Sequence, residues 1–149
     1  MIKILFVCHG NICRSPMAEF IMKDIVEKNN ANHLFEIASR ATSCEELGNP
    51  VYPPAKKKLS ENEILCDGKT ARQITKEDYE YYDYVIAMDN NNLKNLLRLI
   101  GDDKKTSLMM EYAGEYREVS DPWYTGDFEK TYKDIKKACE ALFKKLYKI

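Results

Sequence analysis

Apolar and polar residues follow two periods along this chain, one typical of strands and one typical of helices. Residues 2–7 are apolar except for Lys3, which predicts a strand buried on both faces. The same patterns predict further strands and helices along the rest of the chain. The strands lie at 35–39, 83–88 and 107–112, and the helices at 15–29, 53–62, 90–100 and 128–146. Residues 113–126 are expected to form a long loop rich in Gly, Asp and aromatic residues.

Strands and helices therefore alternate in sequence, which is typical of an α/β fold with a parallel sheet. We expect a three-layer sandwich in which helices cover both faces of the sheet. Residues 1–149 fit a single domain, since no repeat, linker or low-complexity segment divides them. Ligands of such folds bind beyond the carboxyl ends of the strands. The segment that follows residues 2–7 is therefore the first place to look for a site.

The composition argues against several functional classes. The net charge is −1, so bulk electrostatics give no reason to expect nucleic acid or an anionic membrane as a partner. The first apolar run is too short for a signal peptide, and no stretch approaches the ~20 apolar residues that span a bilayer. The five cysteines are an odd number without the spacing of zinc ligands. We therefore expect free thiols in a reducing cytoplasm, and no metal.

The strand at 2–7 runs into the segment Cys8–Pro16, which reads CHGNICRSP and leads into the helix at 15–29. A loop between a strand and a helix turns its backbone N–H groups inward, and the helix dipole favours a bound anion there. A cysteine in such a loop ionises easily, and its thiolate is a nucleophile. Arg14 adds a planar guanidinium that matches phosphate oxygens, and Ser15 is expected to cap the helix. The segment predicts a phosphate-binding loop with a nucleophile built in.

The spacing of Cys8 and Arg14 is not sufficient by itself, because Cys66 and Arg72 reproduce it. Asp67 would put a negative charge where an anion must bind, and no long apolar strand precedes this second copy. We interpret Cys66 as a loop or half-buried cysteine without a catalytic function.

A cysteine that attacks phosphorus needs a proton donor for the departing oxygen, and Asp121 is the candidate. It opens the sequence Asp-Pro-Trp-Tyr in the loop before the last helix. Pro122 stiffens this loop, and Trp123 and Tyr124 are expected to wall a slot for a flat aromatic group. Alone, Asp-Pro is a common turn dipeptide. Combined with the Cys8 segment, it favours an acid–base role for Asp121.

These two motifs resemble those of the low-molecular-weight protein tyrosine phosphatase family. The resemblance covers essentially the whole chain, and between the motifs it runs through Ser39–Ser43, Gly48–Pro50, Ala71–Ile74 and Met88–Asp89. It implies a four-stranded parallel sheet and hydrolysis of phosphotyrosine in proteins or of small aryl phosphates. We accordingly expect inorganic phosphate as product and inhibitor, no cofactor, and a monomer or weak dimer.

The family's roles carry over to matching positions of this sequence. Cys8 would attack phosphorus and form a phosphocysteine, while Arg14 would hold the phosphoryl oxygens. Asp121 would protonate the leaving phenolate and then activate water. The expected phosphate-binding and loop-support residues are His9, Gly10, Asn11, Ile12, Cys13, Ser15 and Ser39, and the expected substrate-pocket residues are Glu45, Asn49, Trp123 and Tyr124.

Within the loop, the resemblance gives Ser15 a hydrogen bond to the Cys8 sulfur. It gives Asn11 a left-handed backbone, which asparagine tolerates, and ties its side chain to Ser39. Two interpretations of Cys13 stay open: a protective disulfide with Cys8, or a small side chain that fills the loop.

Two positions depart from the family's pattern. Lys69 stands where the family often has a histidine in the hydrogen-bond network behind the loop, and a lysine can only donate, for instance to a nearby carbonyl. Glu45 stands at the pocket rim where several relatives carry an aromatic residue, and its charge would disfavour acidic peptides. We expect His9 to be an exposed rim residue without a clear partner, and Asp89 to cap a helix.

Three other chemistries compete with phosphotyrosine hydrolysis. A thiol-dependent arsenate reductase needs two further cysteines placed to relay a disulfide, and Cys66 stands alone in the relevant stretch. A non-hydrolytic phosphocarrier would not need Asp121. Relatives that act on phosphoarginine carry a small polar threonine where this chain has Ile12, and the bulkier apolar Ile12 favours the flat phosphotyrosine ring.

Overall fold

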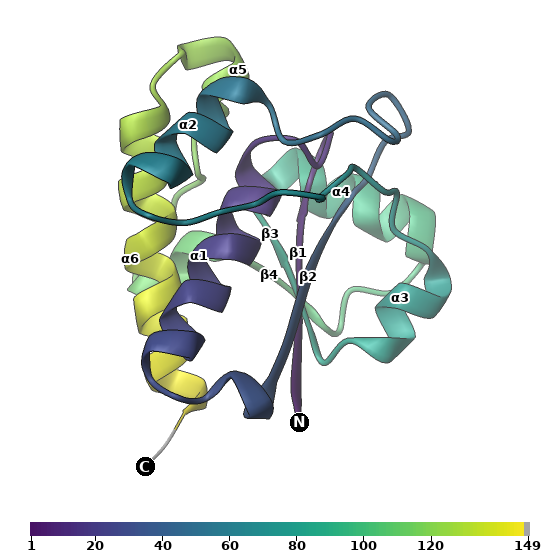
Figure 1. Ribbon diagram of the computed structural model, residues 1–149. Coiled ribbons are helices and arrows are strands. Elements are labelled where there is room, and N and C mark those ends of the chain that lie inside the picture. The colour runs from purple at the N-terminus through teal and green to yellow at the C-terminus, as the bar shows by residue number, and fades with distance from the viewer. Residues whose placement is uncertain (148–149) are drawn as a thin grey trace.

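The computed structural model describes residues 1–147 and contains a four-stranded sheet with helices on both of its faces (Figure 1). The strands are β1 (Ile2–Cys8), β2 (Phe35–Ala41), β3 (Tyr84–Ala87) and β4 (Thr106–Leu108). Their order across the sheet is β2-β1-β3-β4, and each neighbouring pair is parallel. The predicted α/β sandwich is confirmed.

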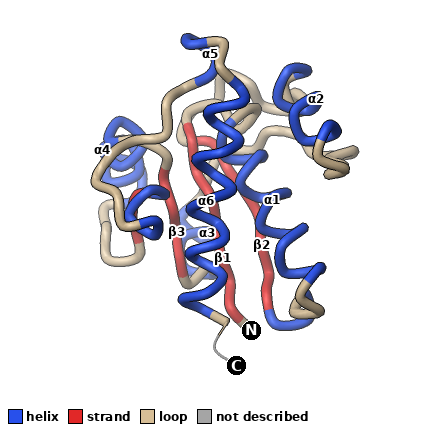
Figure 2. The backbone as a smooth tube through the Cα atoms, turned by 90° about the vertical axis from the view of Figure 1, so that its left-hand side faces the viewer, coloured by secondary structure: helices blue, strands red, loops and turns tan. Residues whose placement is uncertain are grey.

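The helices form the two outer layers. They are α1 (Arg14–Lys28), α2 (Pro53–Glu61), α3 (Lys76–Tyr81), α4 (Asn90–Ile100), α5 (Pro122–Thr125) and α6 (Phe128–Leu146), with the 3₁₀ turns η1 (Asn32–Leu34) and η2 (Met109–Ala113). Helices α1, α2 and α6 lie on one side of the sheet, and α3 and α4 lie on the other (Figure 1). Viewed from the first side, α6 and α1 run side by side in front of the strands (Figure 2).

The central strand β1 is buried on both faces. Its residues Ile4 and Phe6 join the core beneath α1 and α6, and both are 0% exposed. Leu5 and Val7 are also 0% exposed and join the opposite core beneath α4, since side chains alternate across a strand. This double burial explains the continuous apolar run in the sequence, and it fixes the point at which Cys8 emerges from the sheet.

The prediction of a strand at 107–112 is wrong in its second half. β4 ends at Leu108, opposite the last residue of β3, Ala87. Met109 and Met110 are both fully buried in the core beneath α1 and α6. Consecutive residues of a strand point to opposite faces of a sheet, whereas a 3₁₀ turn lets both methionines reach the same core.

The hydrophobic pattern does not predict α3 or the single turn α5. The α3 helix begins with a capping box in which Thr75 and Asp78 each accept the other's backbone N–H, a signature that the sequence does carry. In α5, the Asp121 side chain caps the helix and Pro122 takes its first position. Asp121, the expected proton donor, therefore lies at the start of a helix and not within the long loop expected at 113–126.

The loop before α5 is fastened to α6 by Arg117. The Arg117 guanidinium donates two hydrogen bonds of 2.9 Å to the Asp134 carboxylate and one of 2.8 Å to Glu115. A bidentate arginine–carboxylate pair fixes direction as well as distance. It therefore ties the chain to α6 four residues before Asp121.

Candidate active site

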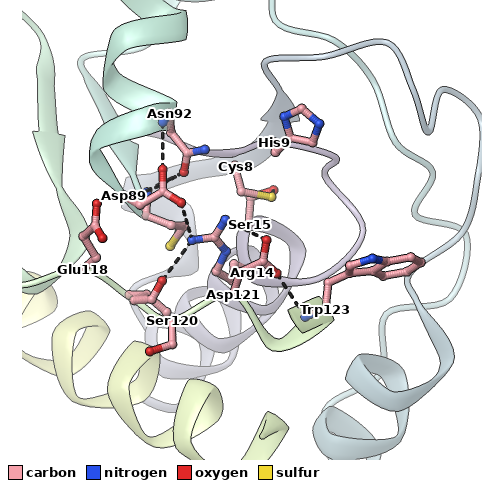
Figure 3. A network of polar contacts seen from close by, with 12 residues as sticks. Cys8, His9, Arg14, Ser15, Asp89, Asn92, Glu118, Ser120, Asp121 and Trp123 are labelled. Carbon is pink, nitrogen blue, oxygen red and sulfur yellow. Dashed lines mark hydrogen bonds and ion pairs between the residues drawn. The ribbon is translucent and has the colours of Figure 1, made fainter. Parts of the chain in front are cut away.

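The segment Cys8–Pro16 forms a loop around the Cys8 sulfur at the carboxyl end of β1. The backbone N–H of Asn11 donates to this sulfur at 3.3 Å, and the Ser15 hydroxyl lies 3.0 Å from it. Figure 3 shows Cys8, Ser15, Arg14 and Asp121 gathered at this loop. Ser15 does not cap α1 as expected, because the cap position falls on Cys13 and the Ser15 hydroxyl is buried against Cys8.

Asn11 holds the loop in shape. Its backbone is left-handed, with φ of 59°, as predicted. Its side-chain amide donates to the hydroxyls of Ser15 at 2.7 Å and Ser39 at 2.9 Å, and its carbonyl oxygen accepts the Arg72 N–H at 3.2 Å. The predicted tie between Asn11 and Ser39 is therefore present, and it connects the loop to β2.

A buried carboxylate, which the sequence analysis missed, ends this network. The Ser39 hydroxyl donates to Glu19 on α1 at 2.6 Å, and the Glu19 side chain is only 5% exposed. Lys69 lies 3.1 Å from Glu19 and donates to the Ser39 carbonyl at 3.0 Å. Burial lowers the pKa of Lys69, while the charge of Glu19 opposes that shift. Lys69 thus holds a carbonyl, as expected, at the position where the family often has a histidine.

The network has a direction, because an ionised carboxylate can only accept hydrogen bonds. Glu19 receives the Ser39 proton, so Ser39 must accept from Asn11, and the Asn11 amide also donates to Ser15. The Ser15 proton is then free to point at the Cys8 sulfur at 3.0 Å, since its other acceptor, the Arg40 carbonyl, is at 3.5 Å. This polarity favours a negatively charged sulfur.

Arg14 starts α1 and is buried beside the sulfur, with 3% of its side chain exposed. Its Nη1 donates to Asp89 at 2.8 Å and to the Val119 carbonyl at 2.9 Å, and its Nη2 lies 3.4 Å from Asp121. Burial would lower the pKa of Arg14, but nearby negative groups, led by Cys8 and Asp121, raise it. A permanent cation is therefore fixed in the loop.

Asp89 has a second contact that the sequence analysis missed. It caps α4 as expected, since one carboxylate oxygen accepts the Asn92 N–H at 2.8 Å. The other oxygen pairs with Arg14. Asp89 thus orients the guanidinium through a contact between two distant segments, which no local motif reveals.

Asp121 lies at the opening of the site, with 29% of its side chain exposed. One of its carboxylate oxygens accepts the Trp123 N–H at 3.0 Å, and the other faces Arg14. These two contacts hold the carboxyl group over the loop. It is therefore placed to exchange a proton with a group bound above Cys8.

Cys8, Arg14 and Asp121 line one pocket of about 160 Å³. The other lining residues are His9, Gly10, Ile12, Cys13, Glu45, Glu46, Trp123 and Tyr124. Trp123 packs on Tyr52 with 4.8 Å between ring centroids, which gives the pocket a supported aromatic wall. The expected wall residues Trp123 and Tyr124 both lie at the pocket, and the sequence analysis missed Glu46 and the supporting Tyr52.

Two rim residues differ from expectation. Asn49 lies beside the pocket, and within residues 1–147 it is not among the lining residues; its amide donates to Glu46 at 2.6 Å. His9 has a clear partner, since its Nε2 lies 2.8 Å from a carboxylate oxygen of Glu45. Both members of this pair are exposed, so it contributes little to stability.

The remaining cysteines are free thiols in the part of the chain that the structure describes. Burial and the neighbouring Cys8 raise the pKa of Cys13, which packs with Ile12 and Ala71, and burial also raises the pKa of Cys66. Cys66 is 4% exposed, so it is more buried than expected. Neither thiol is activated as a nucleophile.

Residues 1–147 contain neither a metal-binding cluster nor a membrane-spanning helix. No group of three or more His, Cys, Asp or Glu side chains is arranged to hold a metal ion. No helix is long and apolar enough to cross a membrane.

Residues 3–149 match the family model described as low molecular weight phosphotyrosine protein phosphatase. The chain is 36% identical to the low molecular weight protein-tyrosine-phosphatase YfkJ of Bacillus subtilis over 152 residues, which cover 99% of this chain and 97% of YfkJ. The YfkJ crystal structure superposes with a TM-score of 0.94 over 98% of this chain and 94% of that one.

Two further solved structures share the fold. SP-PTP, a low molecular weight protein tyrosine phosphatase of Streptococcus pyogenes, is 44% identical with a TM-score of 0.88, covering 99% of this chain and 95% of that one. A Drosophila arginine phosphatase is 29% identical with a TM-score of 0.90, covering 99% of this chain and 99% of that one. Because residues 3–149 of its 149 residues match the family model, the chain belongs to the low molecular weight phosphotyrosine protein phosphatase family.

Proposed function

We propose that this protein is a tyrosine phosphatase that hydrolyses phosphotyrosine and small aryl phosphates through a phosphocysteine. The observation that carries the proposal is the pocket in which Cys8, Arg14 and Asp121 meet beneath an aromatic wall. It combines a nucleophile, a fixed cation and a proton donor within reach of one bound phosphoryl group.

In the first step, the Cys8 sulfur attacks phosphorus, so that a P–S bond forms and the bond from phosphorus to the phenolic oxygen breaks. Asp121 gives its proton to that oxygen as it leaves. The Arg14 guanidinium and the loop N–H groups balance the charge on the phosphoryl oxygens. The released product of this step is the tyrosine hydroxyl.

In the second step, Asp121, now ionised, takes a proton from a water molecule that attacks phosphorus. The P–S bond breaks, and Cys8 leaves as a thiolate that accepts the Ser15 hydrogen bond. Inorganic phosphate remains in the loop until it dissociates. It therefore acts as a competitive inhibitor as well as a product.

The pocket walls favour a phenyl ring over other leaving groups. Ile12 is 9% exposed and lines the pocket together with Trp123, so both residues offer apolar surface to a flat ring. The shared fold does not separate phosphotyrosine from phosphoarginine, because the TM-score of the Drosophila arginine phosphatase, 0.90, lies between those of YfkJ, 0.94, and SP-PTP, 0.88. The wall residues carry this part of the proposal.

The other cysteines argue against arsenate reduction. A disulfide relay needs thiols that can reach one another. Cys139 is 0% exposed and its thiol contacts the Ala18 carbonyl in the core, while burial raises its pKa. Cys44 is exposed and Cys66 is buried. A phosphocarrier, in turn, would have no use for Asp121 above the sulfur.

Free thiols suit a reducing cytoplasm, and a monomer or weak dimer acting as one domain is sufficient for this chemistry. A side-by-side assay tests the substrate class: phosphotyrosine peptide, phosphoarginine peptide and arsenate with a thiol reductant. We expect kcat/KM to be highest for phosphotyrosine, with no arsenate reduction. Preference for phosphoarginine would overturn the substrate class, and arsenate turnover would overturn the reaction.

A further inference from the structure

A second hollow opens beside the Cys8 pocket, and the proposed chemistry does not use it. Its volume is about 360 Å³, and it shares His9, Arg14, Asp121 and Tyr124 with the Cys8 pocket. The rest of its lining comes from the start of α4 and the loop before α5, and includes Asp89, Asn91, Asn95, Glu118 and Ser120. We call it the Glu118 hollow. In Figure 3, Glu118 and Asp89 lie on one side of Arg14 and Trp123 lies on the other.

The Glu118 hollow carries an excess of negative charge. Its lining includes the carboxylates of Asp89, Glu118 and Asp121, and its guanidinium is that of Arg14. Arg14 already pairs with Asp89 and Asp121, so its charge is compensated within the protein. Glu118 is left as the carboxylate without a cationic partner among residues 1–147. A ligand with a positive charge is therefore favoured.

Glu118 is also held in place. One of its carboxylate oxygens accepts the backbone N–H of Asn90, the first residue of α4, at 2.7 Å. The other oxygen accepts no hydrogen bond from residues 1–147, and the side chain is exposed. An oriented carboxylate with a free oxygen binds a cation without first losing much side-chain freedom.

The lining residues of the Glu118 hollow favour an extended organic cation over a metal ion. Residues 1–147 contain no group of three or more acidic, His or Cys side chains arranged to hold a metal, although three carboxylates line this hollow. Asn91 and Asn95 also line the hollow and add neutral hydrogen-bonding groups to the carboxylates. A lysine or arginine side chain has both the length and the donors for such a surface.

We propose that the Glu118 hollow is a subsite for a lysine or arginine side chain that flanks the phosphotyrosine of a protein substrate. This inference rests on the proposed function, since the peptide must enter with its phosphotyrosine in the Cys8 pocket. The two hollows share an edge, so a neighbouring residue of the same peptide reaches Glu118. Exposed ion pairs contribute modestly, which predicts an effect of about two- to fivefold on kcat/KM.

A phosphopeptide scan tests the subsite. One series carries glutamine at every position around phosphotyrosine, and a single lysine or glutamate is moved from four residues before to four residues after it. The kcat/KM of each peptide is measured by phosphate release at low ionic strength and divided by that of the all-glutamine peptide. Wild type is compared with Glu118→Gln, Glu118→Lys, Glu46→Gln and Glu27→Gln, of which the last removes an exposed charge on α1 far from the site.

In wild type and in Glu27→Gln, lysine should raise the ratio about two- to fivefold at one or two adjacent positions. Glu118→Gln should bring that ratio close to one, and Glu118→Lys should reverse it in favour of glutamate. Equal ratios at all positions in wild type, or a lysine preference that survives both Glu118 substitutions, would overturn the subsite. Loss of the preference only in Glu46→Gln would place it at the Cys8 pocket instead. Failure to hydrolyse the all-glutamine peptide would contradict the proposed function itself.

Discussion

At the scale of single residues, the surroundings of each cysteine decide what it can do. Cys8 has the Asn11 N–H and the Ser15 hydroxyl directed at its sulfur, whereas burial raises the pKa of Cys13 and Cys66. The spacing that Cys66 and Arg72 share with Cys8 and Arg14 therefore has no chemical consequence at the second position. The proposed nucleophile depends on hydrogen bonds, and the number of intervening residues does not create them.

Asp121→Asn should lower kcat for phosphotyrosine by about 10²–10⁴ while leaving phosphate inhibition nearly unchanged. Asparagine still accepts the Trp123 N–H but cannot supply a proton. Steady-state kinetics on a phosphotyrosine peptide measure the loss. Asp127→Asn is the matched control, since Asp127 caps α6 through the Lys130 N–H and does not line the pocket. An unchanged kcat in Asp121→Asn would remove this residue from the mechanism.

Ile12→Thr should shift the enzyme away from phosphotyrosine, because a polar side chain then replaces apolar surface beside the ring. We expect the ratio of kcat/KM for phosphotyrosine over phosphoarginine peptides to fall by about tenfold. Ile12→Val keeps the wall apolar and should leave the ratio within about twofold. If both variants retain the wild-type ratio, Ile12 does not determine the substrate.

At the scale of elements, the loop owes its shape to β2 and α1 as much as to its own sequence. Ser39 on β2 and Glu19 on α1 form the far end of the hydrogen-bond network that reaches Ser15 and Cys8. The direction of the donors follows from the acceptor-only carboxylate of Glu19. Glu19 therefore influences the Cys8 sulfur without contacting it.

Glu19→Gln should slow the alkylation of Cys8 by iodoacetamide at neutral pH by about fivefold. The amide of glutamine can donate as well as accept, so the Ser15 proton is no longer forced toward the sulfur, and one hydrogen bond to a charged group is worth about 1 kcal/mol or more. Peptide mapping of the alkylated protein isolates the Cys8 rate from that of the exposed Cys44.

Lys23→Met serves as the control for that experiment. Lys23 contacts the other oxygen of Glu19 at 2.6 Å, so its loss leaves the carboxylate as an acceptor and preserves the direction of the network. Cys8 should react at close to the wild-type rate. Equal slowing in both variants would show that a general disturbance of α1, and not the donor direction, controls the sulfur.

The sequence predicts an element correctly when its hydrophobic pattern follows from one regular packing arrangement, such as a helix with one face on the core. Helix α6 packs one face on the core, and its observed bounds, Phe128–Leu146, agree with the prediction. The prediction fails at Met109 and Met110, where tertiary packing sends two consecutive residues into one core. It also omits α3, because the capping box at Thr75 and not its hydrophobic pattern marks that helix.

In the site, too, local sequence predicts some residues, and tertiary contacts bring in the others. The Cys8 segment and Asp121 are contiguous motifs, so their residue types already indicate the chemistry. Asp89 and Glu46 come from other parts of the chain. Glu19 follows the Cys8 segment on α1 but joins the network only through its tertiary contact with Ser39. No local spacing identifies such residues, although an acidic residue after a buried strand, as at Asp89, is a weak signal.

At the scale of the whole molecule, the tightly packed core makes stability depend on pH through a buried thiol. Cys139 lies between α6 and α1, is 0% exposed, and has its pKa raised by burial above the ordinary value of 9.0. The unfolded chain therefore releases this proton near pH 9, while the folded chain retains it. Above that pH the folded state binds more protons, so the free energy of unfolding falls as pH rises.

Cys139→Ala should remove this dependence. Between pH 9 and pH 10, the stability advantage of wild type over Cys139→Ala should narrow by about 1 kcal/mol, because a thiol with a pKa near 9 is already half ionised in the unfolded chain at pH 9. Urea unfolding at both pH values measures it, and Cys44→Ala, an exposed thiol, should show no such change. A constant difference between wild type and Cys139→Ala would contradict the assignment of a raised thiol pKa.

The central claim is that phosphotyrosine hydrolysis passes through a phosphoryl group on Cys8. The most direct measurement mixes the protein with a phosphotyrosine peptide, quenches it in denaturant during the first turnovers, and maps phosphorylated peptides by mass spectrometry. The account predicts a phosphoryl group on the peptide that contains Cys8 in wild type, and neither adduct nor turnover in Cys8→Ser. Rapid phosphate release without an adduct on Cys8, together with normal turnover by Cys8→Ser, would contradict it.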